Sequence, residues 1–232
     1  MFGAMRQAIG GVLAVALLVA CGGSQQPVDP ARTLRDAATA MGKLNTVKAD
    51  LKFTKGAISF QGFTLFGAKT SVRLPADSDT IYTVKQGDLA ISLEVVIAGG
   101  HVYLHLPFST YQELTGSQAA AVPDLAKLFD PTTGLPAIIP AGRNLSDAGA
   151  DKVDGVDVQK INATYSADQV HSMFAQLSSS VDVKAVVWVG VSDHLIRKAQ
   201  LDGAFGDGGK EAAVEVDISG FNAAVNIAPP SP

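Results

Sequence analysis

The chain has 232 residues, of which 47% are hydrophobic and 17% charged, and its formal net charge is −4. Disordered chains combine low hydrophobicity with high charge, so this composition excludes a disordered protein. The length and the apolar content are enough for the hydrophobic core of one domain, or at most two. We expect one. The 18 Lys and Arg residues are outnumbered by 22 Asp and Glu residues. Binding to a phosphate backbone needs an excess of basic residues, so we do not expect nucleic acid as a partner.

The first twenty residues have the pattern of a signal peptide. They carry one charge, Arg6, followed by an apolar run over residues 8–20. The run is well short of the ~20 residues needed for a transmembrane helix. It ends at Leu18-Val19-Ala20-Cys21, which resembles a bacterial lipobox, where the cysteine takes a diacylglyceryl group and the chain is cut before it. We therefore expect a lipoprotein signal peptide at 1–20 and lipidation of Cys21.

Cys21 is the only cysteine, so it can form no internal disulfide and supply no thiolate metal cage. The alternative is an ordinary secretory signal that ends near a cysteine, or a small buried cysteine. Two or more acyl chains anchor a protein stably in a bilayer, because each CH₂ group buried in the bilayer contributes about 0.8 kcal/mol to binding. We expect residues 21–31 to form the acylated cysteine and a flexible stalk that tethers the protein to the extracytoplasmic face of the cell membrane.

The body begins with a helical pattern and continues with alternating ones. Over residues 33–44 the apolar side chains fall on one helical face, after a start signal at Asp29-Pro30. Apolar and polar residues then alternate over 47–53 and 89–97, as in half-buried strands. Further strands are predicted at 58–66, 80–85, 102–106, 159–165, 183–191, 194–201 and 213–218.

Short turns rich in Gly and Asp join most of these runs, which predicts an antiparallel meander. Only residues 114–145 and 168–180 are long enough to hold helices between strands. Three amphipathic helices must bury their apolar faces against the sheet, which favours a curled sheet over a closed barrel. We predict an α+β fold: a single domain at 32–222, with helices on the concave face of a half-barrel, and a Pro-rich tail at 223–232.

Several short segments, taken in order and spacing, resemble the mycobacterial LppX/LprA/LprF/LprG lipoproteins. They are Phe129–Leu135, Lys152–Val156, Trp188–Val189, His194–Leu195 and Ala199–Asp202. The resemblance runs from the first helix to Phe221 and includes the lipobox and the tail. It implies a half-barrel around a hydrophobic cavity, similar to the bacterial lipoprotein-carrier fold. It also implies binding of acylated envelope lipids: phosphatidylinositol mannosides, lipomannan, lipoarabinomannan, triacylglycerol or phthiocerol dimycocerosates.

No residue pattern indicates catalysis. The chain has no G-x-S-x-G elbow, no H-E-x-x-H and no P-loop, so we expect neither an enzyme nor a cofactor. His101 and His105 share a strand face but stand roughly 13 Å apart, too far to bind one metal. His171 and His194 are expected at the surface. The glycines of 203–209 lack the dinucleotide-binding register and are expected in a hairpin turn.

The apolar faces of strands and helices are the remaining candidate site. From the pattern alone they are core residues, whereas the family implies that a subset lines a ligand cavity. The candidates are Leu89, Ile91, Leu93, Val95, Val102, Leu104, Phe129, Val170, Phe174, Val187 and Val189. The strand near residue 60 is apolar on both faces, so it is expected to form the cavity mouth or a membrane-contacting flap.

Two functions remain open. One is a carrier of multi-acylated lipids or glycolipids. The other is a structural or assembly lipoprotein that docks an envelope partner such as a transporter. A void well beyond the roughly 300–1,000 Å³ of ordinary ligand pockets would favour the carrier, and a filled core would favour the scaffold.

Overall fold

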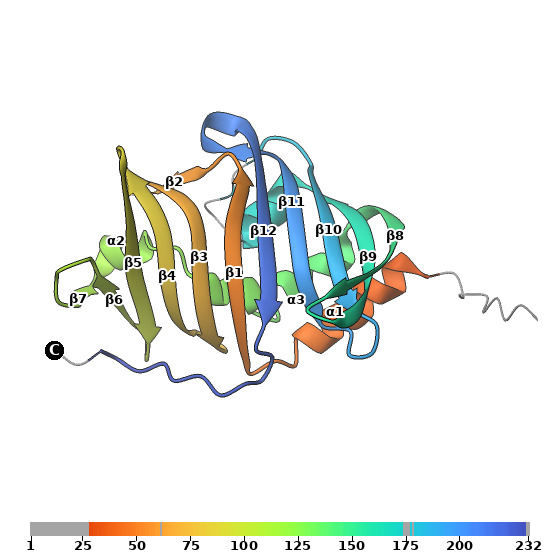
Figure 1. The fold of residues 1–232 in the computed structure, drawn as a ribbon, viewed down its shortest axis with the longest axis horizontal. Helices are drawn as coiled ribbons and strands as arrows, with labels where there is room; N and C mark the ends of the chain where they lie inside the picture. The colour runs from red at the N-terminus through yellow and green to blue at the C-terminus, as the bar shows by residue number, and fades with distance from the viewer. Residues whose placement is uncertain (1–27, 61, 174–176, 178, 231–232) are drawn as a thin grey trace, which may run out of the picture.

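The structure is a computed structural model and describes residues 28–230, apart from 61, 174–176 and 178. In this part of the chain a twelve-stranded antiparallel sheet curls without closing (Figure 1). Its order is β7-β6-β5-β4-β3-β1-β12-β11-β10-β9-β8, and β2 pairs with β3 off this path. The strands are β1 (Thr46–Lys55), β2 (Ile58–Phe60), β3 (Phe63–Arg73), β4 (Asp77–Gln86), β5 (Leu89–Ala98), β6 (His101–His105), β7 (Gln112–Leu114), β8 (Arg143–Val153), β9 (Val156–Tyr165), β10 (Val183–Gly190), β11 (Ile196–Gly206) and β12 (Lys210–Ser219).

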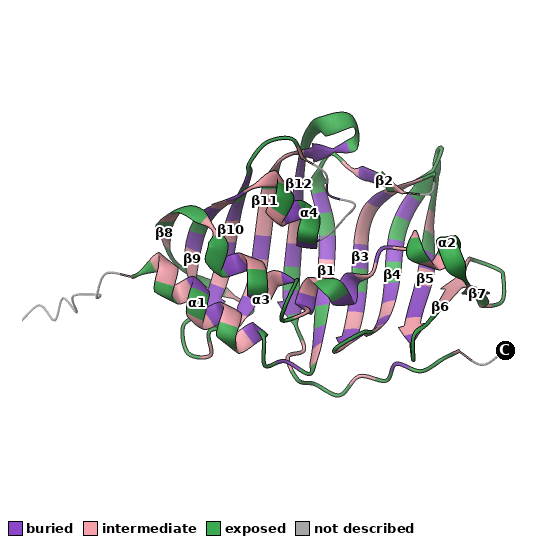
Figure 2. Cartoon of the chain, turned by 180° about the vertical axis from the view of Figure 1, so that it is seen from behind, coloured by how far each residue is buried: buried purple, intermediate pink, exposed green. Residues whose placement is uncertain are grey.

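The helices lie on the concave side of the sheet (Figure 2). The α-helices are α1 (Pro30–Met41), α2 (Gly116–Ala120), α3 (Leu135–Ile138) and α4 (Ala167–Met173), and the 3₁₀ turns are η1 (Leu125–Phe129), η2 (Ile139–Ala141) and η3 (Asp207–Gly209). Asp29 caps α1 by accepting from the amides of Ala31 and Arg32. Of the apolar face predicted for this helix, Leu34, Ala37 and Met41 are buried, and the helix packs against α3 and η2. The predicted span of 33–44 is shifted, because the helix begins at Pro30 and ends at Met41, before Leu44. The predicted α+β half-barrel with helices on its concave face is confirmed.

The sheet consists of two meanders joined at its centre. The first strand β1 pairs with β3 on one side and with the last strand β12 on the other, where Lys48 faces Ser219. The predicted turns at 86–88, 98–100, 192–193 and 206–209 join the neighbouring pairs β4–β5, β5–β6, β10–β11 and β11–β12. The β1–β12 pairing was not predicted, because it joins strands about 170 residues apart and no turn marks it.

The strand predictions need correction at three places, of which the simplest is β7, a three-residue edge strand that was not predicted. The single strand predicted at 58–66 is wrong, because β2 ends at Phe60 and β3 begins at Phe63, with Gly62 at φ +82° in the turn between them. Phe60 and Phe63 therefore pair across a hairpin and share one face. Strand β8 was missed because, at the edge of the sheet, it is polar and exposed along most of its length.

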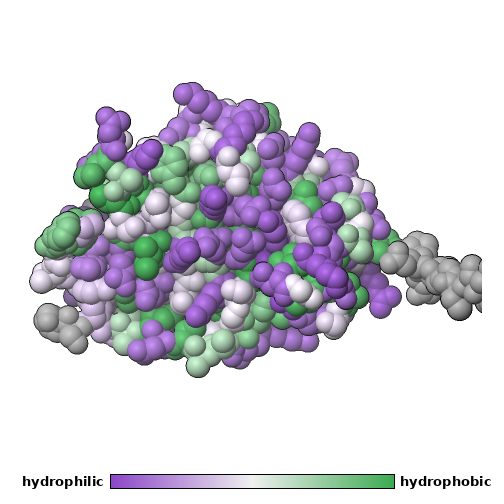
Figure 3. Space-filling model, in the orientation of Figure 1, coloured by the Kyte–Doolittle hydropathy of each residue, from purple (hydrophilic) through white to green (hydrophobic). Residues whose placement is uncertain are grey.

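The main core lies between the concave face of the sheet and the helices. Alternate residues of the strands point into it, as in β1, where Val47, Ala49, Leu51 and Phe53 are buried. The convex face is largely hydrophilic, with scattered apolar residues (Figure 3). A small convex cluster, Val96, Ala98 and Ile227, is covered by the segment after β12.

Candidate functional site

An apolar cavity of about 290 Å³ lies on the concave side, between α2 and strands β4, β5 and β6. The β2–β3 hairpin contributes two aromatic rings, and the stretch around α2 supplies small and apolar residues. The lining consists of Phe60, Phe63, Tyr82, Leu93, Val95, Leu104, Leu106, Leu114, Gln118, Ala121 and Val122. Apart from the Tyr82 hydroxyl and the Gln118 amide, these side chains carry no polar group, which suits hydrocarbon and not a charged ligand.

Strand register brings the cavity walls together. Tyr82 of β4 faces Leu93 of β5, and Val95 of β5 faces Leu104 of β6. Because alternate residues of a strand share a face, Leu93 and Val95 point to the same side of the sheet. The Phe60 ring lies 6.0 Å from Tyr82, between centroids, and closes the cavity at the hairpin.

Helix α2 is the cover of the cavity and is weakly attached. None of its five residues is buried, and Thr115 makes no side-chain hydrogen bond as its N-cap. Just beyond the helix, the Tyr82 hydroxyl donates to the carbonyl oxygen of Pro123 at 2.5 Å. Burial raises the pKa of Tyr82 far above its usual value, so the hydroxyl keeps its proton. This bond ties the end of the cover to the sheet.

A second apolar hollow of about 40 Å³ lies in the other half of the concave face. It is lined by Leu51, Phe53, Leu128, Leu135, Met173, Leu177, Leu201 and Val214. Turn η1 packs on β3 and β4, between the two hollows, and buries Leu125 and Phe129. The half of the core under α3 and α4 is therefore almost filled.

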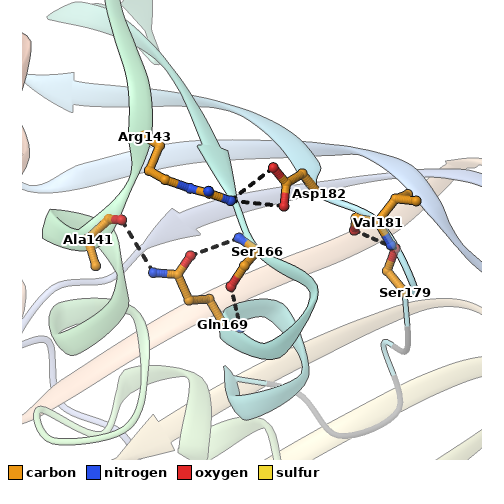
Figure 4. Close-up of polar contacts among 7 residues, drawn as sticks. All are labelled: Ala141, Arg143, Ser166, Gln169, Ser179, Val181 and Asp182. Carbon is orange, nitrogen blue, oxygen red and sulfur yellow. Dashed lines mark hydrogen bonds and ion pairs between the residues drawn. The ribbon is translucent and has the colours of Figure 1, made fainter.

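Helix α4 is fixed over this second hollow by polar contacts (Figure 4). The backbone N–H of Ser166 donates to Gln169 Oε1 at 2.8 Å, and the backbone N–H of Gln169 donates to Ser166 Oγ at 3.3 Å. This reciprocal pattern is a capping box. Gln169 Nε2 also donates to the Ala141 carbonyl at 3.3 Å. Nearby, Arg143 donates to both carboxylate oxygens of Asp182 at 2.9 Å.

The predicted lining residues are distributed over the whole concave face. The first cavity brings together Leu93, Val95 and Leu104. Ile91 and Val102 pack at the edge of the core, and the fully buried residues are Phe129, Val170, Val187 and Val189. Leu89 lies outside the cavity and is 65% exposed, because it is at the tip of the β4–β5 hairpin, where it pairs with Gln86 next to the turn. Phe174 lies outside the described residues.

Sequence reasoning missed the part of the lining contributed by Leu106, Leu114 and the residues around α2. The α2 helix is too short to show a helical period. The sequence did contain a signal for this part of the lining: residues 114–123 contain no charged side chain, as expected of a segment that covers an apolar cavity.

The histidines pair with carboxylates or lie at the surface. His101 Nδ1 is 2.7 Å from Glu113, and His105 Nδ1 is 3.4 Å from Glu94. Within residues 28–230 as described, no three His, Cys, Asp or Glu side chains gather where they would hold a metal ion. In that same part of the chain, none of the helices has the length and apolar character needed to cross a bilayer.

These features define an open half-barrel with an apolar cavity on its helix-covered side. The chain belongs to the LppX_LprAFG lipoprotein family, whose model matches residues 29–227. It is 27% identical over 174 residues to the lipoarabinomannan carrier protein LprG of Mycolicibacterium smegmatis, covering 72% of this chain and 68% of the relative. It is 28% identical over 177 residues to lipoprotein LprA of Mycobacterium tuberculosis, covering 73% and 70%. The sequence segments favour LprG within the family as an expectation, and identities of 27% to LprG and 28% to LprA do not separate the two.

Solved structures of the family share the fold. LprF from Mycobacterium bovis has a TM-score of 0.71 at 17% identity, with 89% of this chain and 99% of that chain covered. LppX from Mycobacterium tuberculosis has a TM-score of 0.62 at 22% identity, with 87% and 100% covered. The names of these relatives describe lipoproteins and a carrier, and none describes an enzyme.

Proposed function

We propose that this protein is a non-catalytic lipoprotein that binds acylated lipids or glycolipids and moves them within the cell envelope. The ligand classes are lipoarabinomannan, lipomannan, phosphatidylinositol mannosides and triacylglycerol. The observation that carries the proposal is the apolar cavity under α2, in a family that includes a protein named as a lipoarabinomannan carrier. Lipidation of Cys21 after removal of residues 1–20 would anchor it outside the cytoplasmic membrane; these residues lie outside the described part.

The physical basis is the cost of exposing hydrocarbon to water. Each exposed CH₂ costs about 0.8 kcal/mol, so long acyl chains do not cross an aqueous space unaided. An apolar cavity replaces the bilayer as solvent for the chain at little net cost, which allows both loading and release. The sugar or phosphate headgroup stays outside, because Gln118 is the only lining side chain with a free polar group.

The cavity must enlarge to hold a multi-acylated ligand. Its 290 Å³ lies below the volume that favours a carrier, and equals only about ten times the roughly 30 Å³ that one water occupies in the liquid. Helix α2 buries none of its residues, so its displacement breaks few contacts. We therefore include opening between α2 and the sheet in the proposed mechanism.

A second candidate is a structural or assembly lipoprotein that docks an envelope partner such as a transporter. The observation in its favour is the nearly filled half of the core, where the hollow measures only about 40 Å³. On this hypothesis the protein carries no lipid, and the cavity under α2 stays empty.

Native mass spectrometry with lipid extraction, on protein purified from a mycobacterial host, tests the proposal. Leu104→Trp places a large side chain in the cavity, and Tyr103→Trp places the same side chain on the opposite face of β6. We expect wild type and Tyr103→Trp to retain a lipid with two or more acyl chains and Leu104→Trp to lose most of it. An empty wild-type protein that also takes up no lipid from vesicles would favour the scaffold.

A further inference from the structure

The turn between β6 and β7 lies at one end of the sheet (Figure 1). It contains the aromatic residue Phe108. Phe108 is fully exposed. Its φ of +65° lies in the left-handed region, which bulky side chains rarely adopt. Strained residues of this kind persist where the surroundings fix them, and they gather at functional sites.

The hydrogen bonds of the turn hold Phe108 in this position. Ser109 Oγ donates to the Leu106 carbonyl at 2.8 Å, and the Leu106 amide donates to Ser109 Oγ at 3.2 Å. His105 Nε2 lies 3.1 Å from the Ser109 carbonyl, and its ring stacks on Tyr111 with centroids 4.6 Å apart. The exposure of Phe108 is therefore built into a fixed turn.

The segment that contains Phe108 has few charges. Residues 106–123, which we call the mouth segment, contain one charged side chain, Glu113, whose carboxylate lies 2.7 Å from His101 Nδ1. Glu94 of β5 accepts a hydrogen bond from the Tyr111 hydroxyl at 2.7 Å. Leu106, at the start of the same turn, lines the cavity under α2. The mouth segment is thus a surface of low charge next to an apolar cavity, so its approach to hydrocarbon desolvates few charged groups.

We propose that the mouth segment docks on a lipid bilayer, with the Phe108 ring inserted at the interface, so that an acyl chain passes directly between bilayer and cavity. This inference deepens the proposed function and rests on it. A bilayer fits the surface because an apolar side chain with uncharged neighbours needs no complementary polar groups from its partner.

The start of the chain lies at the other end of the sheet from the β6–β7 turn. Helix α1 contacts β8 and β10, whereas β7 and β6 form the opposite edge, and both α1 and α2 lie on the concave side (Figure 2). Val28 directly precedes α1, and six residues separate it from Cys21, so the seven residue steps span at most about 25 Å. A lipid anchor at Cys21 would hold one end of the helix-covered side at the membrane, and the mouth segment would dock at the other end.

The test measures membrane contact at position 108 in the complete lipidated protein, reconstituted in phosphatidylcholine vesicles. The chain has a single tryptophan, so Trp188→Phe gives a protein without tryptophan fluorescence, into which one tryptophan can be placed. Phe108→Trp then reports on the mouth segment, and Ile81→Trp, at an exposed site on β4, is the matched control. With brominated phosphatidylcholine we expect quenching several-fold stronger at position 108 than at 81.

Equal quenching at the two positions overturns the proposal. Loss of quenching together with a dimer in light scattering assigns the surface to a second copy and also overturns it. Because the mouth segment carries no basic residue, quenching should change less than twofold when phosphatidylglycerol or salt is added. A rise with phosphatidylglycerol that salt abolishes would contradict docking through the apolar turn.

A second measurement separates docking from lipid binding. Phe108→Ser should slow transfer of a fluorescent diacyl phosphatidylinositol between vesicles several-fold, while the lipid that co-purifies with the protein stays unchanged. An unchanged transfer rate overturns the docking step and leaves lipid binding intact. A wild-type protein without lipid or transfer defeats the proposed function, and the quenching experiment still decides whether the turn contacts the bilayer.

Discussion

The hydroxyl of Tyr82, on β4, donates a 2.5 Å hydrogen bond to the carbonyl of Pro123, just beyond α2. It fastens the cover of the cavity to the sheet. In the other half of the core, the Tyr165 hydroxyl donates to the Ile139 carbonyl at 3.1 Å. The two buried bonds are alike in chemistry, but only the first holds the cavity cover.

Replacing Tyr82 with Phe should loosen the cavity cover. Loss of the bond leaves a buried carbonyl unpaired, which costs about 1–3 kcal/mol of unfolding free energy in a urea titration. Because α2 has few other contacts, Tyr82→Phe should also speed exchange of a fluorescent lipid with vesicles. Tyr165→Phe should cost similar stability and leave the exchange rate unchanged. Equal exchange rates in the two variants would contradict the assignment of α2 as the cover.

Two neighbouring carboxylates of β4 should respond to pH in opposite ways. Burial, and then the charge of Glu94 on the next strand, raises the pKa of Asp79. The Arg73 guanidinium, at 2.8 Å, lowers the pKa of Asp77. A raised carboxyl pKa means stability that is present below the unfolded value and lost as pH rises through the folded one. A lowered pKa means stability that is present at neutral pH and lost in acid.

We therefore expect Asp79→Asn to stabilise the protein at pH 7 by a few tenths to about 1 kcal/mol, an advantage that disappears near pH 3. Asp77→Asn should destabilise by a similar amount at pH 7 and have little effect in acid. Urea titrations at both pH values measure the two differences. A destabilising Asp79→Asn at pH 7 would show that the carboxylate is stabilised by its surroundings instead of opposed by them.

The parts of the fold that could be predicted are those with a local signal. The alternation in β5 gives its bounds to within one residue, since it has Leu93 and Val95 on the cavity side. The β1–β12 pairing has no local signal in the sequence, because it joins the first strand of one meander to the last strand of the other. Edge strand β8 lacks an apolar face, and Gly62 splits a run that looks continuous in sequence.

The candidate site was predicted only in part for the same reason. Periodicity identifies residues that face inward, but it does not say which of them meet a packed neighbour and which meet a void. Val187 and Val95 have the same pattern in their strands, yet Val187 is packed in the core and Val95 lines the cavity. The difference depends on what covers each position: η1, α3 and α4 fill one half, and the short α2 covers the other.

The strain at Phe108 can be tested apart from its role at the membrane. A left-handed backbone costs an ordinary side chain roughly 1–2 kcal/mol, and Asn and Gly tolerate it better. Phe108→Asn should therefore raise the unfolding free energy by about 1 kcal/mol, whereas Phe108→Ala should change it little because alanine retains the backbone cost. Equal effects of Asn and Ala in urea titrations would show that the turn is unstrained.

The segment after β12 should contribute to stability without affecting the cavity. Ile227 is only 4% exposed and packs on Val96 and Ala98 at the convex face, and Arg73 donates to its carbonyl at 2.9 Å. Truncation of a buried Ile costs about 2–5 kcal/mol, so Ile227→Ala should lower the unfolding free energy by at least about 2 kcal/mol. Val225→Ala, at a half-buried position of the same segment, should cost less. Both variants should retain as much co-purified lipid as wild type, because the segment after β12 lies on the opposite side of the sheet from α2. Lipid loss confined to Ile227→Ala would mean that this segment and the cavity are coupled through β5.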